Sequence, residues 1–224
     1  MTTIQEKSVR CAVCGSLGKC YILTSSFTFG SADLDTRPPP LLRSTMFIFV
    51  QQCQTCGYCA QDLSAERQGV RAVVASTCYK EQLSDPRFPK EANWFLCAGI
   101  IDEQCGDLAG AAWARIHAAW VCDDSGECPQ AELCRSKAAE TIIKARERGQ
   151  SISAQDGADV AILVDLLRRS NQFDKAQAVI ESRLNGIQDD IVRKVMEYQT
   201  RLVQERDAST HLLSEALQGA DVGL

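Results

Sequence analysis

The chain has 224 residues, of which 45% are hydrophobic and 24% are charged, and its formal net charge is −5. This composition is ordinary for a globular protein, and the length allows one large domain or a small domain joined to a medium one. No apolar stretch approaches the roughly 18 residues that a membrane-spanning helix needs. The polar start, MTTIQEKSVR, lacks the apolar core of a signal peptide. We therefore expect a cytoplasmic protein without a membrane partner.

Twelve cysteines are the most informative feature of the composition. In a reducing cytoplasm, clustered cysteines indicate metal or redox chemistry rather than a disulfide scaffold. Two segments, 11–15 and 53–57, both follow the pattern CxxCG. Two residues between the cysteines let both thiolates bind one ion from a tight turn, and the glycine permits a backbone conformation that other residues resist. We therefore predict one zinc ion bound by Cys11, Cys14, Cys53 and Cys56.

Four cysteine ligands leave no open position for water, so they favour a structural over a catalytic zinc. Sulfur ligands alone do not separate zinc from iron. Four free or redox-active cysteines are the alternative to a metal site. Between Cys14 and Cys53 lie 38 residues. That spacing is longer than a minimal ribbon needs and predicts an elaborated zinc ribbon.

The segment between the two cysteine pairs predicts two strands. Residues Tyr21–Phe29, which end at Gly30, and Met46–Val50, which lead into the second cysteine pair, are rich in β-branched and aromatic side chains. Between these runs, Arg37–Pro40 contains three consecutive prolines. Such a sequence cannot lie inside a helix and predicts an extended connector.

After Asp62 the apolar residues recur with a helical period of about 3.6 residues. The pattern predicts about seven helices, and the short connections between them predict antiparallel packing of neighbours. Residues from about 209 onward are small and polar, and we expect them to fray. The expected helices are marked by Val70–Thr77, Trp94–Ile101, Leu108–Trp120, Cys134–Ala145, Ile162–Leu167, Phe173–Leu184 and Ile187–Leu202.

The pair of helices at 158–185 is similar to a tetratricopeptide hairpin. Within Leu166–Ala176, a polar turn, the aromatic Phe173 and a small alanine follow in the expected order. That alanine lets two helices approach closely. Because no period of about 34 residues recurs convincingly elsewhere, the pattern predicts one helical hairpin rather than a repeat array.

Two cysteines near the predicted metal site need separate consideration. Cys59 follows Cys56 at another two-residue spacing and could replace one ligand. The two CxxCG turns, here called knuckles, already supply the four ligands of a tetrahedral site. We therefore interpret Cys59, and likewise Cys20, as cysteines that do not bind the metal.

Three cysteines in the helical half, Cys122, Cys128 and Cys134, lie six residues apart. With His117 they could bind a second metal, but this spacing is not a recognised zinc pattern. We interpret them as small buried side chains with one exposed thiol. A redox role would need a depressed thiol pKa.

Catalytic groups are scarce in this chain. Its only histidines are His117, near Trp113 and Trp120 on one helical face, and His211 in the expected tail. We interpret His117 as a core histidine held by a hydrogen bond. No Ser/His/Asp or Cys/His set and no glycine-rich phosphate loop is evident, so we predict no catalytic residues.

Two polar clusters are candidate contacts for a ligand or partner. Asp33, Asp35, Arg37 and Arg43 lie near the predicted metal, and they could equally form internal ion pairs and turn caps.

The second cluster is Arg168 and Arg169, a concentration of positive charge close to a turn. Arginine suits the carboxylates of a protein partner because its planar fork bonds them bidentately. Pairing with Asp165 and Asp174 at a solvated surface is the alternative.

The charge of the cysteine-rich segment disfavours a nucleic-acid partner. Residues 1–63 carry five basic and four acidic side chains, which leaves a charge of +1. One zinc ion bound by four thiolates would add about −2. Proteins that bind nucleic acid usually present a basic surface, which this segment lacks.

The order of these features resembles the DUF2225 family, a family of uncharacterised bacterial zinc-ribbon proteins with a tetratricopeptide-like helical region. The resemblance covers about residues 9–185. Departures are Ala12 and Gln54, which stand where such knuckles usually have proline, and the additional Cys59. The resemblance implies a fold and a metal, but no activity. It rests on Cys11–Gly15, Asp33–Arg37, Cys53–Tyr58, Ala112–Trp120 and Leu163–Ala176.

These observations predict an α+β protein that is mainly α. An elaborated zinc ribbon is expected over 1–63, antiparallel tetratricopeptide-like hairpins over 64–208, and a frayed tail over 209–224. The leading functional hypothesis is a non-catalytic zinc-binding protein whose helices bind an unknown protein. A thiol-based redox switch or enzyme using non-ligand cysteines is the alternative, and a nucleic-acid-binding ribbon is disfavoured.

Overall fold

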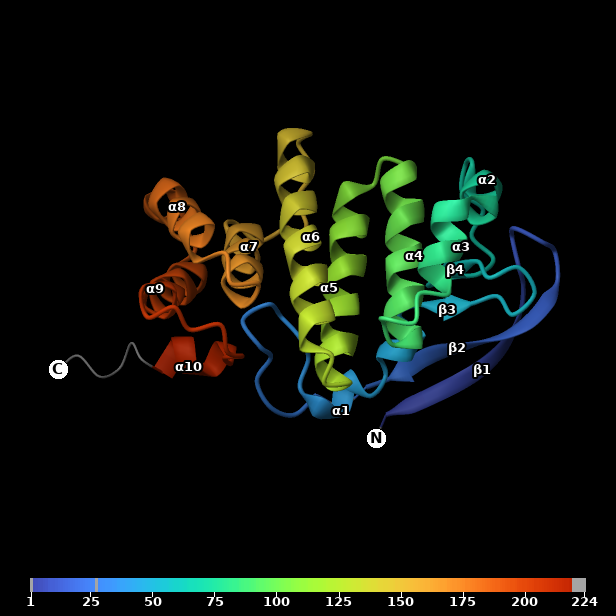
Figure 1. Ribbon diagram of the computed structural model, residues 1–224. Coiled ribbons are helices and arrows are strands. Elements are labelled where there is room, and N and C mark those ends of the chain that lie inside the picture. Colours follow the sequence, from blue (N-terminus) through green and yellow to red (C-terminus); the bar gives the residue numbers. More distant parts are fainter. Residues whose placement is uncertain (1, 27, 219–224) are drawn as a thin grey trace.

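A computed structural model describes residues 2–26 and 28–218, with short strands in the N-terminal part and helices in the rest (Figure 1). Strand β1 (Thr3–Arg10) pairs antiparallel with β2 (Leu17–Ser25), and β3 (Gln51–Gln52) pairs antiparallel with β4 (Cys59–Ala60). Each hairpin is closed by one CxxCG turn, so the two cysteine motifs shape the two small sheets. A mainly helical protein with small antiparallel sheets is therefore confirmed. Phe27, part of the first predicted strand run, lies outside the described residues.

The strand predicted over 46–50 is wrong. The preceding connector contains the short helix α1 (Pro40–Arg43), and the chain continues into a 3-10 helix, η1 (Met46–Ile48). Proline is tolerated at the first helical position, because the N–H that it lacks would have no helical partner there. The Thr45 hydroxyl donates to the Leu42 carbonyl at 2.7 Å, which continues the turn between the two helices. Local hydrogen bonds thus satisfy backbone groups that, in a β-strand, would pair with a neighbouring strand.

The helices after the ribbon agree with the predicted periodicity, except that the first is interrupted. Ser76 has an extended backbone, and its hydroxyl accepts a hydrogen bond from the Tyr79 amide at 3.3 Å, so it caps a new helix. The helices are α2 (Val70–Ala75), α3 (Thr77–Leu83), α4 (Lys90–Gln104), α5 (Leu108–Asp124), α6 (Cys128–Glu147), α7 (Ala158–Arg169), α8 (Phe173–Arg183), the 3-10 helix η2 (Leu184–Gly186), α9 (Asp190–Gln204) and α10 (Leu213–Gln218).

Figure 1 shows α4, α5 and α6 side by side, with α7 next to α6 and with α7, α8 and α9 running at a steep angle to the first three. The hairpin predicted at 158–185 is present as α7 and α8. Its close approach is made at Ala176, which is fully buried. Its tetratricopeptide-like character stays a prediction.

Residues 209–218 are ordered against the N-terminal part, which differs from the expected frayed tail. The Leu34 amide donates to the His211 carbonyl at 3.0 Å, and the Leu213 amide donates to the Ala32 carbonyl at 2.8 Å. These backbone partners come from a segment about 180 residues earlier, so no local pattern in the tail predicts them. Residues 219–224, the rest of the predicted tail, lie outside the described residues.

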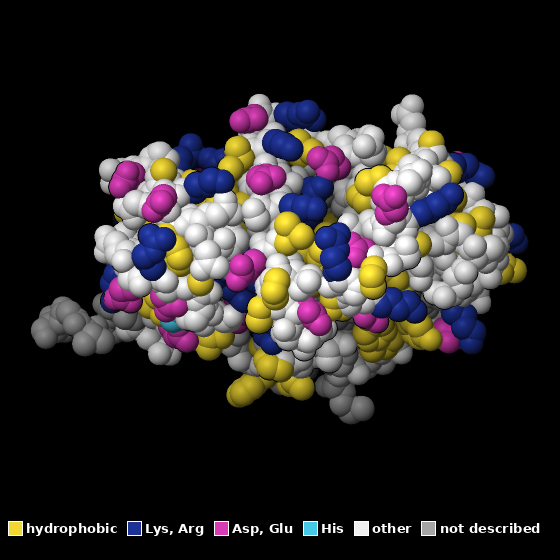
Figure 2. All heavy atoms as spheres, viewed as in Figure 1, with side chains coloured by type: hydrophobic (Ala, Val, Ile, Leu, Met, Phe, Trp, Pro, Cys, Tyr) yellow, Lys and Arg dark blue, Asp and Glu magenta, His cyan; other side chains and the backbone are white. Residues whose placement is uncertain are grey.

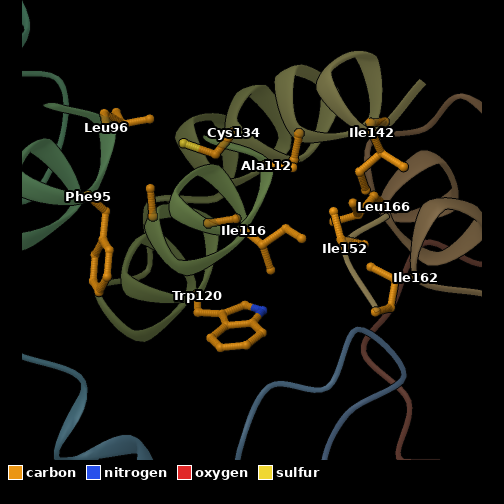
Figure 3. Packing of buried hydrophobic residues seen from close by; sticks show 14 of the residues in the cluster. Phe95, Leu96, Ala112, Ile116, Trp120, Cys134, Ile142, Ile152, Ile162 and Leu166 are labelled. Atoms are coloured by element: carbon orange, nitrogen blue, oxygen red, sulfur yellow. The ribbon is translucent and has the colours of Figure 1, made fainter. Parts of the chain in front are cut away.

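One cluster of buried apolar side chains extends from Val9 in the ribbon to Ala216 in α10. Figure 3 shows its centre, where Phe95 of α4, Trp120 of α5 and Leu166 of α7 belong to the same core. The ribbon and the helices therefore share a continuous core, and this core positions the sites described below.

Candidate metal centre

The four predicted ligands converge. One sulfur from each of Cys11, Cys14, Cys53 and Cys56 lies within 4.8 Å of the other three. The Sγ atoms of Cys11 and Cys56 are 3.7 Å apart, as are those of Cys14 and Cys53. Tetrahedral zinc with bonds of about 2.3 Å places its sulfur ligands about 3.8 Å from one another. The donor set and its spacing thus fit a four-coordinate metal ion.

Each hairpin turn presents its two sulfurs through the same backbone arrangement. The Gly15 amide donates to the Cys11 carbonyl, and the Gly57 amide donates to the Cys53 carbonyl, both at 2.8 Å. The two glycines have φ values of 74° and 78°. These angles lie in the left-handed region, where a side chain would be strained, which explains the glycine after each cysteine pair.

Ser16 adds a polar contact beside the sulfurs. Its hydroxyl lies 3.0 Å from the Cys14 sulfur and 3.5 Å from the Cys53 sulfur. Burial acts to raise the pKa of Cys53, but the Ser16 hydroxyl and the backbone amides of Cys56 and Thr55 outweigh it and lower this pKa to about 6. Burial raises the pKa of Cys56 and of Cys11, so the surroundings favour the thiolate, the form that binds metal, at Cys53 but not at every member of the group.

The other cysteines named in the sequence do not join this group. Cys59 is buried and its thiol donates to the Gly57 carbonyl at 3.3 Å, and Cys20 is buried in β2. In the helical half, Cys122 and Cys134 are buried and share a hydrogen bond, whereas Cys128 is exposed. Among the residues that the structure describes, only the four knuckle cysteines form a metal-ligand group.

The expected polar cluster lies in the interior, where it forms ion pairs. Asp35 is fully buried and accepts hydrogen bonds from the Trp120 indole at 2.9 Å and from Arg169 at 3.2 Å. Arg37 is also buried and pairs with Asp123 at 3.3 Å. Of the two interpretations of this cluster, internal ion pairing is the one that describes Asp35 and Arg37.

The other two members of the cluster, Asp33 and Arg43, make contacts closer to the surface or within the insertion itself. Asp33 is buried 3.8 Å from Arg37, and burial, together with the neighbouring Asp35 carboxylate, raises its pKa to about 6. Arg43 is half-buried and donates to the Pro38 carbonyl at 3.1 Å. These two contacts lie within the insertion of the ribbon, whereas the pairs of Arg37 with Asp123 at 3.3 Å and of Arg43 with Asp124 at 3.5 Å connect the insertion to α5.

Arg168 and Arg169 do not lie on the surface. The first is 0% exposed and pairs with the buried Asp165 at 2.6 Å, while the second is 7% exposed. Arg168 also donates to the carbonyls of Asp207 and Ser209, at 2.6 and 2.8 Å. A partner contact at this pair would need exposed guanidinium groups, so the structure differs from that expectation. The helix face that carries them packs against the returning tail.

Sequence reasoning missed three members of this ion-pair network, Trp120, Asp123 and Arg135. Arg135 is buried and pairs with Asp123. The sequence around Arg135 gave no local signal of its burial, because Glu132, Ser136 and Lys137 make this part of the helix polar.

His117 lies among aromatic rings rather than beside a metal. The ring centroids of Phe95 and Trp120 are 5.1 and 4.8 Å from it. Burial lowers the pKa of His117 to about 4, so its imidazole is neutral at physiological pH. Within the described part of the chain it has ring contacts but no hydrogen bond, unlike the expected hydrogen-bonded core histidine.

Comparison with protein-family models, curated proteins and solved structures found no match to this chain. None of the helices in residues 2–26 and 28–218 is long and apolar enough to cross a membrane.

Proposed function

We propose that this protein is a non-catalytic zinc-binding protein in which one Zn²⁺ ion joins the two N-terminal hairpins. The observation that supports the proposal is the convergence of four thiol sulfurs, with two pairs separated by 3.7 Å. Cys11 and Cys14 would bind from the first hairpin, and Cys53 and Cys56 from the second. The ion would supply structural cross-linking, because four protein ligands leave no position for water or substrate.

A structural metal suits this part of the chain for a second reason. The pairing of β3 with β4 covers only two residues on each strand, and an isolated two-stranded hairpin is marginally stable in water. A shared ion would hold β1–β2 and β3–β4 in one arrangement. Membership of the DUF2225 family belongs to this proposal, supported by the order of the two knuckles and the helical hairpin.

Elemental analysis of freshly purified, reduced protein tests the proposal directly. We expect one zinc ion per chain, because the four sulfurs form one group. Protein prepared in chelator should take up one equivalent of zinc and release protons, since the thiols lose them on binding. Protein that carries no metal, or that carries iron and does not exchange it for zinc, would contradict the assignment.

We further propose that the helical region offers a surface to a protein partner, at a depression between α6, α7 and α8. This depression has a volume of about 250 Å³ and is lined by the apolar side chains of Ile143, Leu163 and Val179. Arg146, Arg183 and Glu147 also line it, and together they carry a net charge of +1 when ionised. Figure 2 shows hydrophobic side chains interspersed with charged side chains of both signs over this part of the molecule. Apolar contacts beside arginines suit an amphipathic acidic segment.

Two exposed isoleucines allow a matched test of this surface. Ile143 lines the depression and is 40% exposed, whereas Ile191 of α9 is 56% exposed and does not line it. A photo-crosslinking residue at position 143 should capture a specific protein that the same residue at position 191 does not. Ile143→Asp should abolish this capture by a crosslinker at position 179, and Ile191→Asp should not. Equal capture from both positions would place the partner elsewhere.

A further inference from the structure

A cavity of about 380 Å³ lies between the second half of the ribbon and the helices α4 and α5. In Figure 1, β4 lies beside α4, and residues of the chain on both sides of β4 form one wall of the cavity. Ligand pockets in proteins typically have volumes of about 300–1,000 Å³ and commonly occur where two parts of a fold meet. The cavity is separate from the four knuckle cysteines, none of which lines it.

Side-chain spacing on the two helices creates the cavity. Its α4 wall is formed by Phe95, Ala98, Ile101 and Asp102, and its α5 wall by Gly110, Trp113, Ala114 and His117. Both sets follow the spacing of one helical face. Each wall has a small alanine in the middle. The helices themselves pack closely at Ala114, where a Cβ at Gly99 would lie 3.2 Å from the Ala114 Cβ, so the cavity lies on the side of the two helices that faces the ribbon. Because α4 and α5 run antiparallel, aromatic groups gather at one end of the cavity and polar groups at the other.

The aromatic end surrounds a neutral histidine. The ring centroids of Phe49, Phe95 and Trp113 lie 6.0, 5.1 and 5.7 Å from that of His117. The imidazole makes no hydrogen bond within the described residues, so both ring nitrogens remain available. Aromatic faces attract cations through the electron density of their rings.

The polar end is acidic. It contains three aspartates and one arginine, Arg67, which pairs with one carboxylate oxygen of Asp102 and lies 3.9 Å from Asp107. The four side chains together carry a net charge of −2 when all of them are ionised.

The geometry at Gly110 leaves space between two of these carboxylates. A Cβ atom at Gly110 would lie 2.6 Å from Asp107 Oδ2 and 3.1 Å from Asp102 Oδ2. Two carboxylate oxygens therefore converge over a position that has no side chain. The other oxygen of Asp107 accepts a hydrogen bond from the Gly110 amide at 2.8 Å, which caps α5 and holds the carboxylate in place.

We propose that this cavity binds a small organic cation, an amine with an apolar body, whose charged group lies at Asp102 and Asp107 and whose body packs against Trp113, Phe95 and His117. An anion would meet the acidic end without a compensating charge, and a neutral molecule would lose the charge-assisted hydrogen bonds. The proposal is independent of the zinc site, and metal content is measured separately from ligand binding.

Isothermal titration calorimetry on the zinc-loaded full chain at neutral pH tests this inference with three probes of similar shape. Phenethylamine is cationic, phenethyl alcohol is neutral, and hydrocinnamate is anionic. Phenethylamine should bind, the alcohol should bind at least about tenfold more weakly because a charge-assisted bond is lost, and hydrocinnamate should not bind. Equal affinities for all three, or no binding of the amine, would overturn the proposal.

Variants then locate the binding site. Asp107→Asn should weaken phenethylamine binding about tenfold while keeping the helix cap, since asparagine caps as well as aspartate. Ala98→Leu should fill the middle of the cavity and abolish binding, whereas the matched change Ala178→Leu, at an exposed position of α8, should leave binding unchanged. Zinc content and helicity should stay the same in all three variants. Undiminished binding to both Asp107→Asn and Ala98→Leu would overturn the assignment to this cavity.

Discussion

Cys53→Ser should abolish zinc binding and unfold the N-terminal hairpins. Cys53 is buried, and its sulfur lies 3.7 Å from that of Cys14 on the other hairpin. Structural zinc sites contribute about 10–16 kcal/mol of binding free energy in small zinc-dependent domains, whereas whole domains are stable by about 5–15 kcal/mol. Loss of one thiolate therefore removes a contribution as large as the stability itself. The measurements are zinc per chain and the rate of limited proteolysis within residues 1–63.

Two other cysteines make this experiment specific. Cys105→Ser changes an exposed cysteine outside the ligand group and should leave both zinc content and proteolysis unchanged. Cys59→Ser changes a buried residue beside the second knuckle and should lower stability without releasing zinc. If Cys59→Ser releases the metal and Cys56→Ser does not, the ligand assignment is wrong.

Asp35→Asn should destabilise the whole protein by about 3–5 kcal/mol, because it removes one charge from a buried ion-pair network. Asp35 accepts hydrogen bonds from Trp120 at 2.9 Å and Arg169 at 3.2 Å. Arg135 also lies 3.9 Å from its carboxylate. Without that carboxylate, two buried guanidinium groups lose part of their charge balance, and an uncompensated buried charge is costly. Urea unfolding followed by circular dichroism measures the change.

Asp174→Asn is the matched control, because it removes the same charge from a surface. The Asp174 side chain is 97% exposed and lies 3.7 Å from the exposed Arg206. Exposed pairs contribute little, so the midpoint of unfolding should hardly move. Zinc content should be normal in both variants. Similar midpoints for Asp35→Asn and Asp174→Asn would show that the network does not stabilise the fold.

The cysteine ligand set and most of the helices were predictable from the sequence because their determinants are local. Two residues between cysteines and a following glycine define a turn wherever they occur, and a period of about 3.6 residues defines a helical face. The strand predicted at Met46–Val50 failed for the opposite reason. Its apolar pattern also suits a buried 3-10 turn, and in the structure the Ile48 amide donates to the Thr45 carbonyl at 3.0 Å and the Phe49 amide to the Met46 carbonyl at 2.9 Å.

Only the tertiary structure decided what the charged residues do. Arg168 and Arg169 follow a helical pattern that is equally compatible with a solvated surface, yet they are buried against acids and carbonyls from distant segments. The aromatic and acidic ends of the cavity likewise come from different helices and from the ribbon. A charge is tolerated inside a protein only when it has partners, and most partners of Arg169 come from distant parts of the chain. Local spacing therefore determined the group of four cysteines that could hold a metal ion, whereas long-range packing determined the ion pairs, the returning tail and the cavity.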